Sequence, residues 1–385
     1  MTTRMALARI IIGTSLVLLG GCASEPLPLI AAGTRSPEIA NPQIDAALGE
    51  KLQENEKEIA GKIAAAIEVG MRRRFVAGQR ARRDAHPKSH GCVAAKFKVA
   101  RSLPEDLAKG VFVRGKTYDA LIRFSNADED ANRPDFEGDG RGMAIKLLGV
   151  PGEKLLNIEQ ESTTQDFIMI SHPVFLIDNI SDYLFLLELN NSDRLLTKIF
   201  RPITIPFALG LKGTSIAWAT TAKKIANPLY ARYWSTVPYQ LGTDAGRKAI
   251  KFSARPCFEG DPKLPTNPSA NFLREAMAQT LENGAACMEF LVQPRTSSAM
   301  SVENSQVEWL EANAPFHKVA SISIPKQKFD TLEQNNICEN LSFNPWHALP
   351  EHRPLGSINR LRKVIYPYLR QVRQELNSLP VNNSD

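Results

Sequence analysis

The sequence predicts an α+β protein, in which a mostly antiparallel β body is interrupted and followed by helices. Short stretches of strand-like residues, separated by glycine, aspartate and proline turns, recur from about residue 93 onward. The chain has 385 residues, of which 43% are hydrophobic and 23% charged, as is typical of a folded protein with a large core. We expect strands at 96–99, 118–125, 143–148, 166–170, 250–253, 288–292 and 319–324, and helices near 180–190, 269–283 and 357–378.

The N-terminus has the features of a secretory signal. Arg4 and Arg9 precede or adjoin a short apolar run that ends near residue 19, which is too short to favour a membrane-spanning helix. The following Leu-Gly-Gly-Cys at 19–22 resembles the lipobox of bacterial lipoproteins, although a plain signal peptide with a chance cysteine is the alternative. We therefore expect a signal peptide at 1–21, lipidation of Cys22, and a lipid anchor in the outer membrane that leaves the protein facing the periplasm.

The segment after Cys22 predicts a tether and then a folded body. Residues 22–44 contain four prolines among small residues, which is typical of a linker. From 44 to about 75, apolar residues recur at spacings near four, and this pattern predicts an amphipathic helix that packs on the body. The folded domain is expected to occupy 45–385.

Several classes of function lack support in the sequence. The formal net charge of +6 is mild and not concentrated in a stripe, so nucleic-acid binding is not favoured. No Cys-x-x-Cys pair, phosphate loop or dinucleotide fingerprint is present. Four cysteines follow Cys22, an even number that suits either disulfides or buried thiols.

The last expected helix carries the sharpest chemical pattern. Arg362 precedes Tyr366 by four residues and Arg373 follows it by seven, so the three side chains share one helical face. A nearby guanidinium favours the phenolate form of a tyrosine, and a phenolate is a hard anionic ligand for ferric iron. Pro367 is expected to disturb the helix just after Tyr366.

Six blocks in this order resemble the haem catalase superfamily, in which a tyrosine is the axial iron ligand. The blocks are Ser-His-Gly at 89–91, Ile-Arg-Phe-Ser at 122–125, Asp-Gly-Arg-Gly-Met-Ala-Ile-Lys at 139–146, Pro-Val-Phe-Leu-Ile at 173–177, Ser-Phe-Asn-Pro at 342–345, and the Arg362-to-Tyr366 spacing with Arg373. The resemblance covers roughly residues 85–375. It implies a catalase-like antiparallel β-barrel, with haem b packed between the barrel and the helices.

The resemblance also implies roles on the distal side of the haem. His90 would be the acid/base that moves a proton between the two peroxide oxygens, and Ser125 would hydrogen-bond and orient His90. The family's distal asparagine is replaced here by Ser171. The arginine that the family places three residues before the distal histidine corresponds, for His90, to Pro87.

On the proximal side, the resemblance makes Tyr366 the iron ligand and Arg362 the group that keeps Tyr366 anionic. Arg123 and Arg373 would bind the haem propionates. The sequence ends soon after this helix, so we expect no NADPH site.

These features predict a haem-dependent oxidoreductase that decomposes hydrogen peroxide or an organic or lipid hydroperoxide. The alternative is a lipoprotein that keeps the barrel without its chemistry and acts as a haem-binding or envelope-binding module. Ser171 and Pro87 are the residues that favour this alternative. The expected partners are a small hydroperoxide and the membrane that holds the lipid anchor.

Overall fold

The computed structural model describes residues 37, 39, 41–76, 78–156, 162–192, 195–258, 260 and 262–378, with only the backbone for 195–199, 201 and 202. The expected signal peptide, Cys22 and the tether up to residue 36 lie outside the described residues. Within the described part of the chain, no helix combines the length and the apolar character needed to cross a bilayer.

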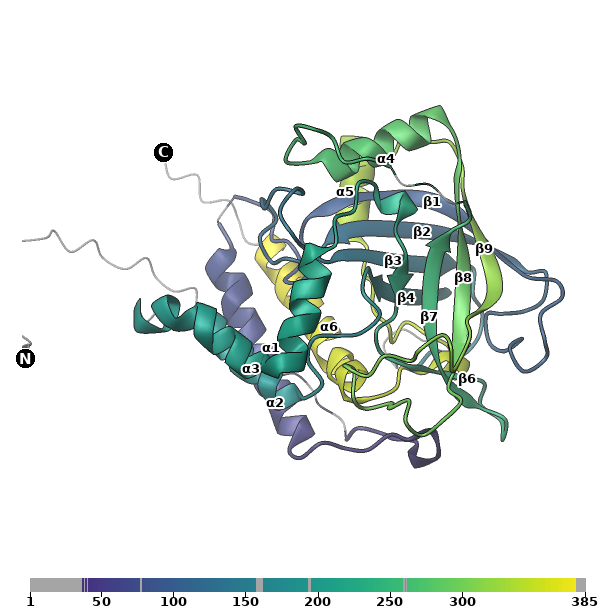
Figure 1. The fold of residues 1–385 in the computed structure, drawn as a ribbon, viewed down its shortest axis with the longest axis horizontal. Coiled ribbons are helices and arrows are strands. Elements are labelled where there is room, and N and C mark those ends of the chain that lie inside the picture. The colour runs from purple at the N-terminus through teal and green to yellow at the C-terminus, as the bar shows by residue number, and fades with distance from the viewer. Residues whose placement is uncertain are drawn as a thin grey trace, which may run out of the picture. The chain divides into compact units, whose positions relative to one another are not determined.

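Eight antiparallel strands form a closed barrel, as Figure 1 shows. They run around the ring in the order β5-β4-β3-β2-β1-β9-β8-β7, and a pairing between β5 and β7 closes it. The short β6 (Tyr239–Leu241) adds to β7 outside the ring. The ring strands are β1 (Ser89–Val99), β2 (Thr117–Asn126), β3 (Arg141–Leu148), β4 (Thr164–Ile170), β5 (Tyr233–Trp234), β7 (Lys248–Pro256), β8 (Ala286–Pro294) and β9 (His317–Ile324). The expected strands and the expected barrel are confirmed.

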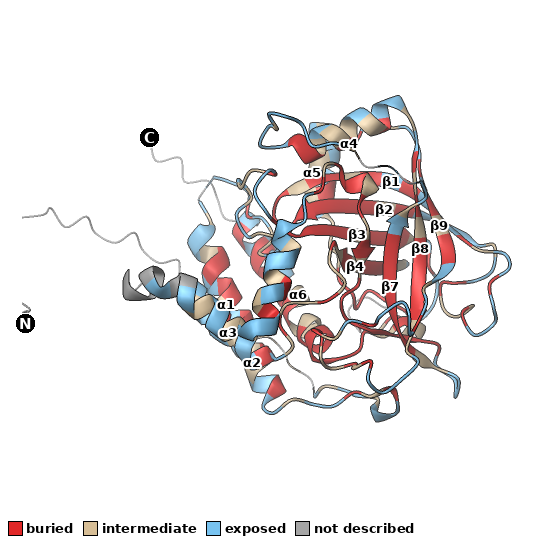
Figure 2. Ribbon diagram, viewed as in Figure 1, coloured by how far each residue is buried: buried red, intermediate tan, exposed pale blue. Residues whose placement is uncertain are grey.

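Packed aromatic rings fill the barrel interior. Phe167 lies with its ring centroid 4.8 Å from that of Phe290 and 5.0 Å from that of Phe252. Phe97 packs edge-on against Phe290 at 5.1 Å. These rings are fully buried, and the strands that carry them are mostly buried in Figure 2. Because side chains occupy the interior of a small barrel, a large cofactor has to lie outside it, between strands and helices.

The helices form two groups around the barrel. The first group contains α1 (Glu56–Arg74), α2 (Ile180–Asn191), α3 (Leu195–Ala222) and α6 (Ser357–Ser378), in which α1 packs on α2 and α6, and α3 packs on α2. The second contains α4 (Phe272–Asn283) and α5 (Leu332–Asn340), which both contact β1. Figure 1 shows the first group on one side of the barrel. Short 3-10 turns lie at Ala46–Leu48, Pro228–Tyr230 and Pro350–His352.

The helix expected from residue 44 begins later than predicted. The 3-10 turn Ala46–Leu48 ends at Gly49, whose φ of 93° is favourable for glycine. The α-helix starts only after Asn55, which has a left-handed φ of 53°. Leu48 therefore packs in a separate small cluster with Trp309 instead of continuing the apolar face of α1.

The four cysteines after Cys22 form two disulfides. Cys92 on β1 pairs with Cys338 on α5, and Cys257 pairs with Cys287 on β8. The alternative of reduced buried thiols does not apply to these residues. The first disulfide joins α5 to the strand that leads away from the candidate site described below.

A buried ion cluster joins the start of α6 to the start of α1. Arg360 lies with Nε 2.6 Å from Glu56 Oε1, and with Nη1 3.0 Å from Glu50 Oε1 and 2.9 Å from Glu303 Oε1. Burial alone would lower the pKa of Arg360, but Glu56 and Glu303 raise it above its usual value. Without Arg360, three carboxylates would lose the cation that they share.

Replacing Arg360 with methionine is expected to lower the free energy of unfolding by about 3–5 kcal/mol, because it leaves the buried Glu56 without its cation and Glu50 with Arg353 alone. Urea unfolding of the variant and the wild type measures this loss. Lys62→Met, which breaks the exposed pair of Lys62 with Glu58 on α1, is the control and should change stability little. Equal effects of the two substitutions would contradict a structural role for the cluster.

Two buried histidines predict loss of stability in acid. Burial lowers the pKa of both His90 and His352 to about 3, against about 6.5 in an unfolded chain. Between these values the unfolded chain binds more protons, so stability falls as the pH drops below about 6.5. The free energy of unfolding, measured at a series of pH values, should show this fall. His352→Gln should reduce the slope of that free energy against pH by the equivalent of up to one bound proton. A pH-independent unfolding free energy between pH 6 and 4 (roughly this window) would refute the expectation.

Candidate functional site

The Ser125 side chain at the end of β2 meets a histidine, but a different one from that expected. Ser125 Oγ lies 3.1 Å from Nδ1 of His86, in the segment before β1. The carbonyl of His86 accepts a hydrogen bond of 2.8 Å from Arg123. The predicted hydrogen bond between Ser125 and His90 is therefore wrong.

The position of His86 depends on a glycine. A Cβ added to Gly142, on β3 beside Ser125, would lie 2.5 Å from Nδ1 of His86 and 2.8 Å from the Oγ of Ser125. His86 itself has a left-handed φ of 59°, which is uncommon for a residue other than glycine. Desolvation first, and then the charges of Arg123 and Arg362, lower the pKa of His86 to about 4. His86 as a whole residue is half-buried, and with this lowered pKa its imidazole is neutral at neutral pH.

His90 belongs to a buried polar network on the other side of β1. Its Nε2 lies 2.8 Å from the Asn126 side-chain oxygen, and the Asn126 amide donates to Asp135 at 2.9 Å. Asp135 also pairs with Lys88 at 2.8 Å and accepts the backbone N–H of Leu273 in α4. The network joins the loop after β2 to α4. The side chain of His90 is almost fully buried, and its Nδ1 has no hydrogen-bond partner among the described residues.

Ser171, the residue in the place of the family's asparagine, is also buried. Its Oγ accepts the backbone N–H of Arg141 at 3.0 Å, at the start of β3. The described hydrogen bonds of Ser171 thus go to the backbone of the neighbouring strand. They include none to His86 or His90.

Three arginines converge on one glutamate of α5. Arg83 Nη1 lies 3.0 Å from Glu339 Oε2, and Arg123 Nη2 lies 3.5 Å from Glu339 Oε1. Arg373 donates to the Glu339 backbone carbonyl at 3.0 Å. The two predicted propionate ligands, Arg123 and Arg373, are thus brought together, and Arg83 joins them without having been predicted. We call these three residues the arginine cluster.

The arginine cluster holds more positive charge than its partner neutralises, since three guanidinium groups face one carboxylate. Burial and the neighbouring arginines lower the pKa of Arg83 to about 8, while Glu339 opposes this effect. Burial also lowers the pKa of Arg123 and that of Arg373. The buried Nε of Arg123 has no hydrogen-bond partner among the described residues. The cluster is therefore suited to further carboxylate or other anionic groups.

Replacing Glu339 with glutamine removes the only carboxylate bonded to the side chains of Arg83 and Arg123 in the described part of the chain. We expect the variant to lose roughly 3 kcal/mol of unfolding free energy, because three buried cations then lack a counter-charge. Denaturant unfolding at neutral pH measures the loss. Glu333→Gln, an exposed change on the same helix, is the matched control and should behave like the wild type. If Glu339→Gln also behaved like the wild type, the charge excess would be refuted.

Arg362 and Tyr366 on α6 face the same region as His86. Arg362 donates to the Asn359 side chain at 3.2 Å, and its guanidinium lies 5.7 Å from the centre of the Phe175 ring. Its charge lowers the pKa of His86, and Tyr366 and Arg362 both act on the pKa of Tyr239, which burial raises to about 12. Arg362 is thus a common neighbour of the predicted iron ligand and of His86.

Tyr366 keeps part of its surface accessible within this group of side chains. Pro367, which was expected to disturb α6, lies inside a continuous helix from Ser357 to Ser378. Among the described residues, no three His, Cys, Asp or Glu side chains lie close enough together to hold a bare metal ion. A single phenol oxygen such as that of Tyr366 would need a cofactor to complete the coordination of iron.

The sequence contains a signal for His86 that the prediction missed. The family's arginine stands three residues before its distal histidine, and Arg83 stands three residues before His86. Choosing His86 instead of His90 therefore restores the arginine that Pro87 seemed to replace. No sequence pattern indicated Glu339, because the short helix α5 was not expected.

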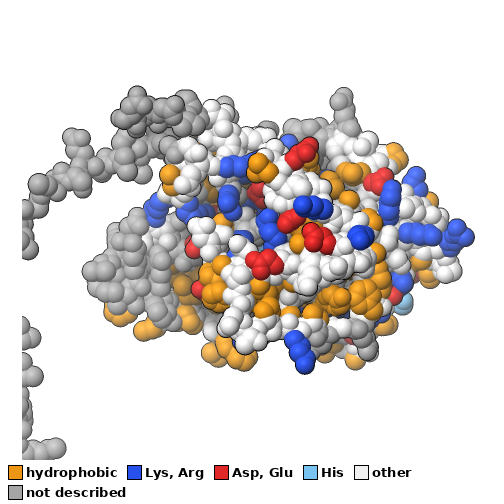
Figure 3. All heavy atoms as spheres, turned by 90° about the horizontal axis from the view of Figure 1, so that it is seen from above, with side chains coloured by type: hydrophobic (Ala, Val, Ile, Leu, Met, Phe, Trp, Pro, Cys, Tyr) orange, Lys and Arg blue, Asp and Glu red, His pale blue; other side chains and the backbone are white. Residues whose placement is uncertain are grey.

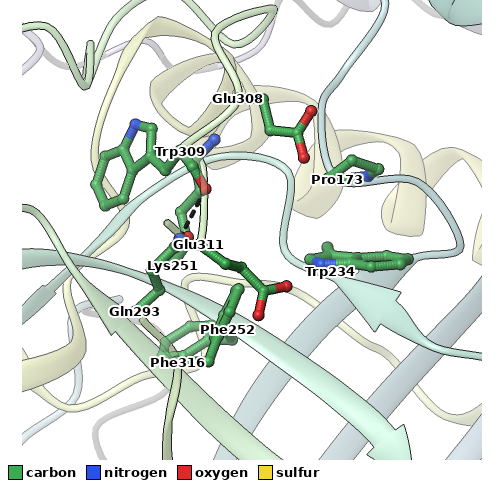
Figure 4. A pocket seen from close by; sticks show the side chains of 9 residues that line it. All are labelled: Pro173, Trp234, Lys251, Phe252, Gln293, Glu308, Trp309, Glu311 and Phe316. Carbon is green, nitrogen blue, oxygen red and sulfur yellow. Dashed lines mark hydrogen bonds between the residues drawn. The ribbon is translucent and has the colours of Figure 1, made fainter. Parts of the chain in front are cut away.

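A separate small pocket lies between β5, β7 and the segment 308–316, as Figure 4 shows. Lys251 lies in it beside Trp309, with its Nζ 5.1 Å from the centre of the indole ring, and donates to the Val307 carbonyl at 3.2 Å. The cavity measures about 10 Å³, which is room for roughly one water molecule. It is too small to hold a cofactor and shares no lining residue with the His86 region.

Comparison with known proteins agrees with the barrel topology. A fungal catalase has a TM-score of 0.58 at 14% sequence identity, with 89% of this chain and 69% of that chain covered. Catalase A from Saccharomyces cerevisiae has a TM-score of 0.59 at 17% sequence identity, with 89% of this chain and 70% of that chain covered. A bacterial catalase has a TM-score of 0.56 at 16% sequence identity, with 89% of this chain and 66% of that chain covered. No family model and no curated protein matches the sequence. At these identities the similarity establishes the fold.

Proposed function

We propose that this chain, which has the fold of the catalases, binds haem b and decomposes hydroperoxides as a catalase- or peroxidase-like oxidoreductase. The observation that carries the proposal is the arginine cluster beside His86. Arg123 belongs to both, since it donates to the His86 carbonyl and pairs with Glu339. A buried excess of positive charge next to a neutral imidazole suits a cofactor that carries two carboxylates.

The residues present fit such a cofactor. Arg83, Arg123 and Arg373 would hold the propionates, and the unpartnered Nε of Arg123 supplies a buried donor for them. Tyr366 would be the iron ligand, with Arg362 one helical turn before it on α6. Bound haem supplies the redox chemistry that cleaves the O–O bond of a hydroperoxide.

His86 is the proposed acid/base in place of His90. With a pKa of about 4, its Nε2 is free of a proton at neutral pH when Nδ1–H donates to Ser125. It would therefore accept a proton from the near oxygen of the hydroperoxide and return it to the far one. If Ser125 accepts from Nδ1–H, it holds the ring in the tautomer that this transfer requires, and Gly142 leaves room for this contact.

One observation favours the second candidate function, a barrel lipoprotein that binds haem or another envelope ligand without catalysis. Glu339 already lies at the arginine cluster, as an internal carboxylate in the place proposed for a propionate. In that case the Glu339 carboxylate of the protein itself takes the place of an external carboxylate at the arginine cluster. The envelope location and the lipid anchor at Cys22 belong to both proposals.

The purified chain with and without added hemin tests the proposal. We expect hemin to bind and the loaded chain to consume hydrogen peroxide or a fatty-acid hydroperoxide well above the rate of free hemin. Bound hemin with no turnover of either substrate would favour the non-catalytic candidate. Failure to bind hemin at all would reject both haem functions.

A further inference from the structure

Helix α3 exposes a row of large apolar side chains. Phe200, Ile203 and Phe207 follow one another at spacings of three and four residues, which places them on one helical face. Gly210, with φ 65° and ψ 177°, kinks the helix, so that Leu211 and Trp218, seven residues apart, form a second exposed pair on the half that follows the kink. Phe207, Leu211 and Trp218 are 84%, 95% and 72% exposed. Figure 3 shows hydrophobic side chains gathered along one edge of the molecule.

The opposite face of the same helix is packed on the body. A Cβ added to Gly213 would lie 2.7 Å from the Leu176 carbonyl oxygen, and Ile216 is buried. A Cβ added to Gly138, in the loop before β3, would lie 2.4 Å from the Thr221 carbonyl oxygen. The half of α3 after Gly210 is therefore held in place. Its exposed apolar row is a fixed outer surface that no described residue covers.

The charges of this segment have one sign. Residues 195–222 contain Lys198, Arg201 and Lys212 and no aspartate or glutamate, and Lys223 and Lys224 follow directly. Lys212, Lys223 and Lys224, whose side chains are described, are exposed; cations of this kind disfavour contact with a second copy and are complementary to anionic lipid headgroups. Helices of this kind lie in the plane of a membrane, with the apolar face about 5–10 Å below the headgroups.

We propose that the exposed apolar side chains of α3, on both halves of the kinked helix, insert into the surface of an anionic phospholipid bilayer. The predicted lipid anchor is consistent with this contact, since the chain from Cys22 to Ala46 can span at most roughly 80 Å and keeps the body near its membrane. The proposal stands on the surface of α3 and does not depend on haem binding.

The contact would bring lipid close to the candidate site. Gly213 rests on Leu176, and the neighbouring Phe175 lies under the guanidinium of Arg362. The segment 173–177 thus connects the bilayer-facing helix to the region around His86 and Tyr366. For the proposed enzyme, this arrangement favours a hydroperoxide that is dissolved in the lipid phase.

Quenching of tryptophan fluorescence by brominated phospholipids tests the insertion. The chain has four tryptophans. Trp218 is exposed, whereas Trp309 and Trp346 are buried. The purified chain, reconstituted with vesicles of phosphatidylethanolamine and phosphatidylglycerol, should be quenched, and Trp218→Phe should lose most of the quenching. The double variant Phe207→Asp, Leu211→Asp should reduce the wild-type quenching several-fold.

Leu332→Asp, at an equally exposed leucine of α5, is the matched control and should be quenched like the wild type. Unquenched wild-type protein, or quenching that Trp218→Phe leaves unchanged, would overturn the proposal. So would a dimer that forms in vesicle-free buffer and that the double variant abolishes, because a second copy would then occupy this face. Far-UV circular dichroism confirms that the surface variants are folded.

Discussion

Replacing His86 with alanine is expected to reduce hydroperoxide turnover by the hemin-loaded chain about 10²–10⁴-fold, the usual effect of losing a positioned general acid/base. Among the described residues it is the His86 ring that Ser125 contacts, and its pKa of about 4 leaves it unprotonated and able to accept a proton at neutral pH. Hemin occupancy should stay close to that of the wild type. Turnover per bound hemin, measured by peroxide consumption, gives the result.

His90→Ala is the matched control for this experiment. His90 is a buried partner of Asn126, so its loss should cost about 1–3 kcal/mol of stability and leave turnover per folded, loaded molecule nearly unchanged. The opposite outcome, in which His90→Ala is inactive and His86→Ala retains full turnover, would return the acid/base role to His90. It would also mean that the contact between Ser125 and His86 has no catalytic purpose.

Replacing Tyr366 with phenylalanine is expected to abolish stable hemin binding while the chain remains folded. The side chain is partly accessible on α6, and phenylalanine keeps its packing but removes the oxygen proposed to bind iron. Hemin titration followed by gel filtration measures how much cofactor each variant retains.

Tyr239→Phe is the control, because Tyr239 is a neighbouring phenol that senses Arg362 and Tyr366 but is fully buried. It should retain hemin at the wild-type level. Retention of hemin by Tyr366→Phe with an unchanged spectrum would show that another group is the ligand. Loss of hemin binding in both variants would indicate that the two phenols support the shape of the binding region and that neither result identifies the ligand.

Much of the fold follows from the pattern of apolar residues. Seven strands and the terminal helix were predicted because their alternation and their 3.6-residue period are regular. The helix α3 was missed, since Pro202, Pro206 and Gly210 interrupt a segment that is apolar on nearly every side. The helix α5 was missed because its nine residues are mostly polar, and it is held by a disulfide and by arginines from distant segments.

The candidate site was predicted only in part. Arg123 and Arg373 do meet, and Ser125 does orient a histidine, because these positions follow from strand and helix register. The choice between His86 and His90 could not be made from local sequence. The two lie only four residues apart, His86 before β1 and His90 at the β-bulge between Ser89 and Gly91. Only the pairing of β1 with β2 and the small size of Gly142 place His86 at Ser125.

The resonance Raman spectrum of the wild-type chain after hemin addition tests the central claim most directly. We predict the vibrations of a phenolate bound to ferric iron, present in the wild type and in Tyr239→Phe and absent from Tyr366→Phe. A chain that binds hemin without those vibrations, or that leaves hemin free in solution, would contradict the account.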